Sequence, residues 1–239
     1  MLYQKTKSST TNYDCSACIL GHICVASDLN NTELNKINNL KHEKIQIKKK
    51  EKLLISHQQT IYGVRYGSLK IQIEKPTIFN KIVEFCLPGE LIGLNNLHNE
   101  KHEFSVIALE NSELCIINIQ HLDHISQDRP YLQKQFREIM SKEITKSHYM
   151  LSILSLTSSK KRVIAFLLNM SSKYEKLGYS SNNFILKMSR KEIGNFLGIT
   201  LETVSRILNQ LMKEKMILIK NRNVILKNKE QLKNQLLNQ

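Results

Sequence analysis

One stretch, Ser189–Leu211, constrains the fold of this 239-residue chain most strongly, because it predicts two short helices joined by a tight turn. Ser189 is a favoured residue at a helix start, and Glu192 follows at the spacing of a capping box, which supplies partners to two backbone N–H groups. Gly198 then offers the positive φ with which many helices end. The first helix therefore has both a predicted beginning and a predicted end.

The second helix begins after Thr200, a good N-cap, and has two different faces. Apolar residues recur at helical spacing on one face: Val204, Ile207, Leu208 and Leu211. The opposite face carries Leu201, Glu202, Thr203, Ser205 and Arg206. Arginine can bind guanine O6 and N7, glutamate can accept from cytosine N4, and serine can bond either kind of base edge. The pattern indicates a helix that reads the DNA major groove, although an ordinary amphipathic pair with a solvated charged face has the same spacing.

The charge distribution favours the DNA interpretation. The chain carries a net charge of +14, and residues 160–239 hold 16 Lys and Arg against 5 Asp and Glu, which is +11. Such a basic domain gains from counterion release at phosphates. A membrane-surface role fits less well, since the charge does not lie on a lone amphipathic helix with bulky aromatics. Without a signal peptide or a long apolar run, the sequence predicts a soluble cytoplasmic protein.

Three cysteines near the N-terminus have metal-ligand spacing. Cys15, Cys18 and Cys24 form a C-x2-C-x5-C pattern, and a fourth ligand would come from Cys86 or Cys115. In a reducing compartment such cysteines are thiols or ligands rather than disulfides. A zinc site, an iron–sulfur cluster and unliganded thiols all remain open. The absence of a second paired hook favours iron–sulfur over zinc.

The middle of the chain predicts a small β domain followed by a long helix. Short β-prone runs separated by Gly and Pro extend from about residue 40 to 121, at the spacing of a roll or barrel. A helix over 131–156 follows Pro130. Its heptad-like stripe is Met140, Ile144, Ser147, Leu151 and Leu154. A second copy of the chain would bury this stripe in a homodimer; alternatively it packs on its own β domain.

The predicted organisation is α+β, in four parts. Residues 1–30 form a cysteine-rich segment, 31–128 a β-roll, 129–157 a dimerisation helix and 158–239 a winged helix-turn-helix domain. In the last part, a helix over 160–176 precedes the two short helices, and 216–226 predicts a hairpin wing that could touch phosphates. The polar tail 227–239 is expected to be frayed.

This order of elements resembles the CRP/FNR superfamily of bacterial transcription regulators, and within it the FNR (fumarate and nitrate reduction) oxygen sensors. The resemblance covers nearly the whole chain. Its motifs are the N-terminal cysteines, Ser112-Glu-Leu-Cys115, Leu87-Pro-Gly-Glu-Leu-Ile-Gly93 and Glu202-Thr-Val-Ser205-Arg206. It implies that the roll is a cyclic-nucleotide-binding-like jelly roll, that the chain is not an enzyme, and that RNA polymerase is a partner.

The resemblance also implies a cofactor and a DNA site. A 4Fe-4S cluster would be held by Cys15, Cys18, Cys24 and Cys115, leaving Cys86 as a small buried hydrophobe. Glu202, Ser205 and Arg206 would read a TTGAT-type half-site, as in TTGAT-N4-ATCAA, and the wider DNA-binding set adds Ser189, Thr200 and Thr203. Cyclic-nucleotide binders of this fold hold the phosphate with an arginine, but the corresponding stretch here is Glu103-Phe104-Ser105. No cyclic nucleotide is therefore expected.

The leading hypothesis is an oxygen-responsive regulator in which loss of the cluster shifts a dimer toward monomer. One position departs from the resemblance: FNR proteins can place an acidic residue in the middle of the seam, where this chain has Ser147. A serine is cheaper to bury than paired carboxylates, so we expect a tighter cluster-free dimer than the family pattern implies. The alternatives are a regulator of the same fold with zinc or no metal, and an iron–sulfur electron-transfer protein. No Gly-rich phosphate loop or Ser-His-Asp arrangement supports an enzyme.

Overall fold

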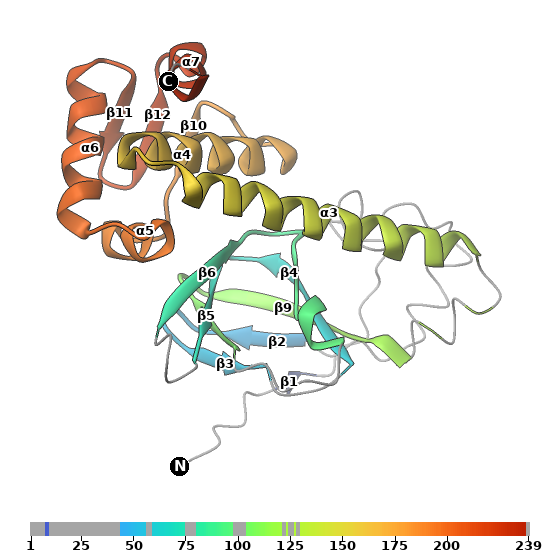
Figure 1. Cartoon of the computed structure of the whole chain (residues 1–239). Coiled ribbons are helices and arrows are strands. Elements are labelled where there is room, and N and C mark those ends of the chain that lie inside the picture. The colour runs from blue at the N-terminus through green and yellow to red at the C-terminus, as the bar shows by residue number, and fades with distance from the viewer. Residues whose placement is uncertain are drawn as a thin grey trace. The chain divides into compact units, whose positions relative to one another are not determined.

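A computed structural model describes residues 8–9, 44–55, 59–74, 80–97, 104–120, 123, 127 and 130–237 of the chain (Figure 1). The chain divides into two compact units, Met1–Glu143 and Ile144–Gln239. One long helix, α3 (Pro130–Ser155), contributes residues to both units.

The first unit is a β-roll of two antiparallel sheets. The first sheet has the order β1-β2-β9-β4-β7, and the second has the order β3-β8-β5-β6. Their strands are β1 (Ser8–Ser9), β2 (Lys44–Ile47), β3 (Lys52–Leu54), β4 (Thr60–Tyr66), β5 (Leu69–Ile73), β6 (Lys81–Cys86), β7 (Leu91–Ile92), β8 (Phe104–Ala108) and β9 (Ser112–Asn118). A short 3-10 helix, η2 (Leu94–Leu97), follows β7. The predicted runs all form strands, and the α+β roll is confirmed.

The core of the roll lies between the inward faces of the two sheets. It includes Ile45 and Ile47 from β2, Val64 from β4, Val106 from β8 and Leu114 from β9. Alternate residues of a strand point to opposite faces, so the residues between these, including Cys115, lie on the other face. A smaller apolar cluster joins Ile61, Leu91 and Ile119 to Phe136 and Ile139 of α3. The first part of α3 thus packs on its own roll.

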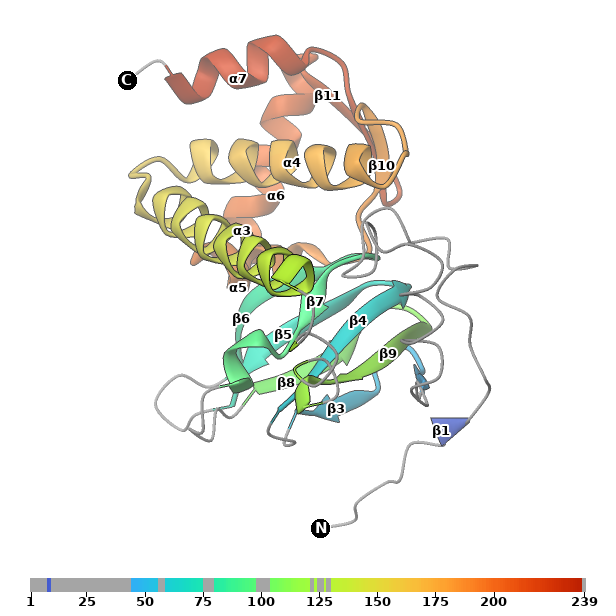
Figure 2. The ribbon, with the colours of Figure 1, turned by 90° about the vertical axis from the view of Figure 1, so that its right-hand side faces the viewer.

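The second unit contains the predicted winged helix-turn-helix (Figure 2). Its elements are α4 (Ser159–Lys176), β10 (Asn183–Ile185), α5 (Arg190–Leu197), α6 (Leu201–Lys213), β11 (Ile217–Lys220), β12 (Asn223–Leu226) and α7 (Lys229–Leu237). The three strands form an antiparallel sheet in the order β10-β12-β11. Phe166 of α4 and Phe196 of α5 pack edge to face, with ring centroids 5.9 Å apart. The three helices α4, α5 and α6 each bury an apolar face.

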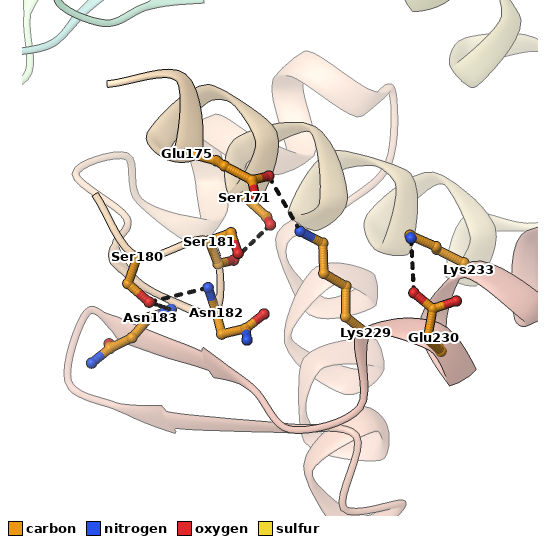
Figure 3. Close-up of polar contacts among 9 residues, drawn as sticks. All are labelled: Ser171, Glu175, Ser180, Ser181, Asn182, Asn183, Lys229, Glu230 and Lys233. Atoms are coloured by element: carbon orange, nitrogen blue, oxygen red, sulfur yellow. Dashed lines mark hydrogen bonds and ion pairs between the residues drawn. The ribbon is translucent and has the colours of Figure 1, made fainter. Parts of the chain in front are cut away.

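The expectation of a frayed tail is wrong, because residues 229–237 form α7. Leu232 is fully buried, and α7 packs against α4. Figure 3 shows the polar contacts beside this packing: Lys229 pairs with Glu175 of α4 at 3.6 Å, and Ser171 donates to the Ser181 carbonyl at 2.6 Å. A single leucine in a polar segment is a weak sequence signal for a helix. The helix forms here because the segment packs against α4. None of the helices in the described part of the chain is long and apolar enough to cross a bilayer.

Candidate nucleic-acid interface

The first helix of the motif has the predicted cap. Ser189 is extended, with φ −79° and ψ 161°, and its Oγ accepts from the Glu192 amide at 3.2 Å. The Glu192 carboxylate in turn accepts from the Ser189 amide at 2.7 Å and from its hydroxyl at 2.8 Å. Both halves of the capping box are present, so the start of α5 is held on two sides.

Two glycines make the turn between α5 and α6 possible. Gly198 ends α5 in the left-handed region at φ 66°. The Ile199 amide donates to the Gly194 carbonyl at 3.0 Å, and a Cβ on Gly194 would lie only 2.6 Å from the Ile199 oxygen. Gly198 thus supplies the left-handed backbone conformation that ends α5, and Gly194 allows the Ile199 backbone to approach α5 closely.

The recognition helix α6 separates its two faces as predicted. Thr200 caps it, accepting from the Thr203 amide at 3.2 Å. The predicted apolar residues are all buried: Val204, Ile207, Leu208 and Leu211. Glu202 and Arg206 are exposed on the opposite face, while Thr203 and Ser205 are half-buried. The arrangement leaves the charged groups on the open side of the helix.

The wider set of predicted DNA-binding residues has local roles as well. The Ser189 and Thr200 hydroxyls serve as caps, and the hydroxyls of Thr200 and Thr203 lie 3.1 Å apart. In the wing, Arg222 follows Asn221 at the hairpin tip and donates from Nη1 to the Lys187 carbonyl at 2.8 Å. This guanidinium therefore ties the predicted wing, β11–β12, to the segment before α5.

Sequence reasoning did not find the ion pair at the far end of α6. Lys160 Nζ lies 2.9 Å from both oxygens of Glu214, the residue that ends α6, and Gln210 Nε2 donates to Glu214 at 2.8 Å. The hydrogen bond from Lys160 lowers the pKa of Glu214 more than any other cause, against a smaller opposing effect of burial. The pair joins the start of α4 to the end of the recognition helix, over 54 residues of chain that give no local signal.

The candidate metal ligand Cys115 lies on the outer face of β9, away from the core. In the strand ladders it is opposite Gly63 of β4 and Lys44 of β2. Its thiol is half-buried and donates weakly to the Gly63 carbonyl at 3.5 Å. A Cβ at position 63 would lie only 2.7 Å from the sulfur, so the thiol packs closely over a residue that has no side chain.

Charged residues lie on the strand positions next to Cys115. Glu113, two residues before Cys115, pairs with Arg65 and lies 3.9 Å from the Lys44 ammonium. Gln46 donates to the other Glu113 oxygen at 3.3 Å. Arg65 lies where the β4–β9 register shifts, and a bulge of this kind redirects a side chain. The environment of Cys115 is therefore polar and partly cationic, unlike that of a cysteine in a core.

The other cysteines divide in two groups. Cys86 is fully buried in the core of the roll, which confirms the expectation that it is a small hydrophobe. Cys15, Cys18 and Cys24 lie outside the described residues. Among the residues that are described, no three His, Cys, Asp or Glu side chains come together as a metal-binding group.

The register of β1 shows where the N-terminal segment approaches the roll. Ser9 pairs with Lys44, and Lys44 pairs with Cys115 on the next strand. Strands are about 4.8 Å apart, so the backbone of Ser9 lies about 10 Å from that of Cys115. Cys15 is six positions after Ser9, and an extended chain of that length reaches about 20 Å. The first of the three clustered cysteines is thus within reach of Cys115.

The predicted seam on α3 is partly open. Ile144 and Leu151 are 55% and 64% exposed, Ser147 is exposed, and Met140 and Leu154 are half-buried. Ile144 and Leu151 are one heptad apart on the same face of α3. Large aliphatic side chains with so much exposed surface are typical of a surface that a partner covers.

Comparison with known proteins identifies both units. Residues 46–129 match the family of the cyclic nucleotide-binding domain, and residues 161–235 match the Crp-like helix-turn-helix domain. The chain is 45% identical over 212 residues to the transcriptional regulatory protein btr of Bordetella pertussis, covering 88% of each chain. It is 32% identical over 220 residues to the fumarate and nitrate reduction regulatory protein of Yersinia pestis, covering 91% of this chain and 88% of that one.

A solved structure supports the same fold. FixK2 from Bradyrhizobium japonicum superposes with a TM-score of 0.71 at 24% identity, over 82% of this chain and 97% of that one. Its likeness concerns the fold alone, whereas the curated relatives exceed 30% identity over most of their length. The chain belongs to the CRP/FNR family of transcription regulators.

Proposed function

We propose that the protein is an oxygen-responsive DNA-binding regulator of the FNR type, with a 4Fe-4S cluster held by Cys15, Cys18, Cys24 and Cys115. The observation that carries this proposal is the position of Cys115 on the outer face of β9, opposite a glycine and in register with the N-terminal strand. Relatives named as anaerobic and as fumarate and nitrate reduction regulators support it.

The residues present fit such a group. The missing side chain at Gly63 accommodates the outward-facing Cys115 sulfur, and β1 brings the chain close enough for Cys15 to reach it. Lys44 and Arg65 supply positive charge near a thiol that must ionise to become a ligand. When bound, the cluster would supply a redox centre that reacts with oxygen. The chain supplies the attachment, which ties the N-terminal segment to the outer face of the β-roll.

The DNA-binding half of the proposal rests on α6. The exposed Glu202 and Arg206, with Ser205 between them along the helix, match the base-reading chemistry of a TTGAT-type half-site, with Arg206 on the guanine. Two copies joined along Met140, Ile144, Ser147, Leu151 and Leu154 would present two such helices to the palindrome TTGAT-N4-ATCAA. The capping hydroxyls of Ser189 and Thr200, with Thr203, complete the proposed contact set.

We do not propose a cyclic nucleotide as the signal. Ser105 is fully buried and its hydroxyl donates to Glu74 at 2.5 Å, while Lys52 pairs with the other Glu74 oxygen at 2.9 Å. Burial raises the pKa of Glu74, but the bonds from Ser105 and Lys52 outweigh it, so the net pKa is lowered. A phosphate brought to Ser105 would meet this ionised carboxylate, and like charges in a partly buried site repel.

The test compares one preparation under two atmospheres. The full chain is purified without oxygen, its absorbance, iron and sulfide are measured, and its affinity for a TTGAT-N4-ATCAA duplex is determined before and after air. We expect a brown chromophore with about four irons per chain, as the cluster type requires. Air should remove the chromophore and the DNA affinity together.

An Arg206→Ala variant isolates the DNA half of the proposal. It should keep the iron and lose roughly 5- to 150-fold in affinity per half-site, since a bidentate guanine contact is worth about 1–3 kcal/mol. Arg190→Ala, which removes an exposed arginine from the start of α5, serves as the matched control and should keep the discrimination between half-site sequences. A colourless or zinc-containing protein that binds the duplex equally in air would sink the oxygen switch.

A further inference from the structure

One guanidinium in the second unit joins the ends of two helices. Arg162 lies near the start of α4; its Nε donates to the Leu156 carbonyl at 2.7 Å and its Nη1 to the Leu197 carbonyl at 3.3 Å. Leu156 is the first residue after α3, and Leu197 is the last residue of α5. Carbonyls at helix ends lack intrahelical partners and attract cations, so the side chain satisfies two such groups at once.

The two bonded carbonyls belong to segments with different roles. The link from α3 to α4 is only Leu156, Thr157 and Ser158, and Ser158 is already the N-cap of α4. The other segment ends in Gly198, which begins the turn into the recognition helix; a Cβ there would lie 3.9 Å from Arg162 Nη1. The side chain thus contacts both the exit of the proposed dimer helix and the turn that precedes α6.

We propose that Arg162 is a positioning residue that fixes the direction in which α3 leaves the DNA-binding unit, and thereby the spacing of the two recognition helices in the dimer. Without the Arg162 hydrogen bonds, several backbone dihedrals of the three residues between α3 and α4 would be free to vary, and the direction of α3 with them. The effect on the spacing of the recognition helices rests on the proposed dimeric DNA binding. The two hydrogen bonds of Arg162, which we call the clamp, lie within one chain.

The planar fork of arginine suits this role better than lysine. Arginine presents several N–H donors in fixed relative directions, so two carbonyls are held at a set angle. A lysine ammonium keeps the positive charge near both helix ends, but it is a compact group on a flexible chain and its N–H donors have no fixed direction relative to the two carbonyls. The Arg162→Lys variant therefore preserves the favourable interaction with the helix dipoles while releasing the geometry.

The first test is amide hydrogen exchange on the full chain without DNA. Two reporter amides have known partners: Leu156 N–H donates to Ile153 at 3.2 Å, and Ile199 N–H donates to Gly194 at 3.0 Å. In Arg162→Lys and Arg162→Ala we expect exchange to rise about tenfold at both amides, the order of effect of losing a charge-assisted hydrogen bond. If exchange became faster only at the Ile199 amide, Arg162 would act only as a cap of α5, and the proposal would be overturned.

A neighbouring lysine provides the matched control. Lys161 also donates to a carbonyl near a helix end, that of Leu236 in α7, at 3.3 Å. Its replacement by alanine removes a bond of the same kind that leads to neither α3 nor α5. Lys161→Ala should leave exchange at Leu156 and Ile199 within about twofold of the wild type.

The second test measures spacing preference on DNA. Duplexes carry two half-sites separated by four or five base pairs, or a single half-site; one extra base pair rotates the second site by roughly 35°. The wild type should prefer one spacing, and in Arg162→Lys this preference should fall about tenfold while single-site affinity stays within about twofold. An unchanged preference would overturn the proposal.

The two tests separate the clamp from the proposed function. If the wild type binds none of the duplexes, the proposed DNA site fails while the exchange experiment still decides whether Arg162 joins the two segments. A mere loss of folding stability would weaken single-site binding as much as paired binding, and would leave the ratio of the two spacings unchanged.

Discussion

Two cysteines on different sheets of the roll have opposite environments. Cys115 faces outward beside Gly63 and charged groups, whereas Cys86 is enclosed in the roll. We expect Cys115→Ala, purified without oxygen, to lose the chromophore and bound iron. Cys86→Ala should keep both and cost about 1 kcal/mol of unfolding free energy, because it leaves a small cavity. Iron assay and urea unfolding check both expectations; equal iron in the two variants would remove Cys115 from the ligand set.

The Glu214 carboxylate should make stability depend on pH. Its folded pKa is lowered, first by the hydrogen bond from Lys160, so its contribution is present above the unfolded pKa of about 4.3. The contribution is lost as the pH falls through the lower folded pKa. Glu214→Gln should thus be less stable than wild type at pH 7 by roughly 0.5 kcal/mol, since the pair is partly exposed, and this difference should shrink as the pH falls below about 4.3.

Urea unfolding between pH 3 and 7 measures that difference. Glu230→Gln is the control, because Glu230 pairs with Lys233 at the surface with its side chain 76% exposed. It should behave like the wild type throughout. A constant gap between Glu214→Gln and wild type over the whole range would show that the ion pair does not carry the effect.

Residues with local partners were predictable from the sequence, and residues with distant partners were not. Ser189 with Glu192, Gly198 and Thr200 act within one turn of chain, and all take the predicted backbone roles. Arg162 bonds a carbonyl 35 residues away, and Lys160 a carboxylate 54 away. Such contacts exist only after the helices pack, so no local pattern marks them.

The same division holds for elements. Strands of five to seven residues that contain several β-branched side chains, such as β4 and β5, were predicted, whereas β3, β7 and β10 contain only two or three residues. β10 forms because Asn183, Phe184 and Ile185 pair with β12 across about 40 residues of chain. Short strands of this kind depend on their partners more than on their own propensity. Helix α7 likewise depends on a tertiary contact, the packing of Leu232 against the rest of the unit, more than on its own sequence.

The α7 helix should depend on one side chain. Leu232 is fully buried against the rest of the unit, so Leu232→Ala should cost about 2–4 kcal/mol of unfolding free energy. It should also expose Lys229 and Lys233 to trypsin, because Leu232 is the one buried residue of α7. Leu237→Ala is the control: that side chain is 78% exposed, and its loss should stay within about 0.5 kcal/mol. Equal stabilities for the two variants would show that α7 is not docked through Leu232.

At the scale of the molecule, the basic helix-turn-helix unit and the proposed cluster ligands are separated along the chain. Residues 160–239 hold +11 of the net +14, while the candidate cluster ligands all precede residue 116. The helix α3 has residues in both compact units, so under the proposed function it is the element through which a change at the roll would affect the oligomeric state. The middle of α3 is therefore where the whole protein's response is expected to be set.

Ser147 is exposed at the centre of the proposed seam, between the exposed Ile144 and Leu151. A dimer would bury two serines there rather than two carboxylates, so we expect the cluster-free protein to remain dimeric at micromolar concentration. Ser147→Asp should weaken that dimer at least about tenfold, since two like charges must be brought together. Thr145→Asp adds the same charge on the opposite side of the helix and should leave the dimer unchanged. Sedimentation equilibrium of the three proteins decides the matter: a wild type that is wholly monomeric would show that the open seam alone does not join two chains.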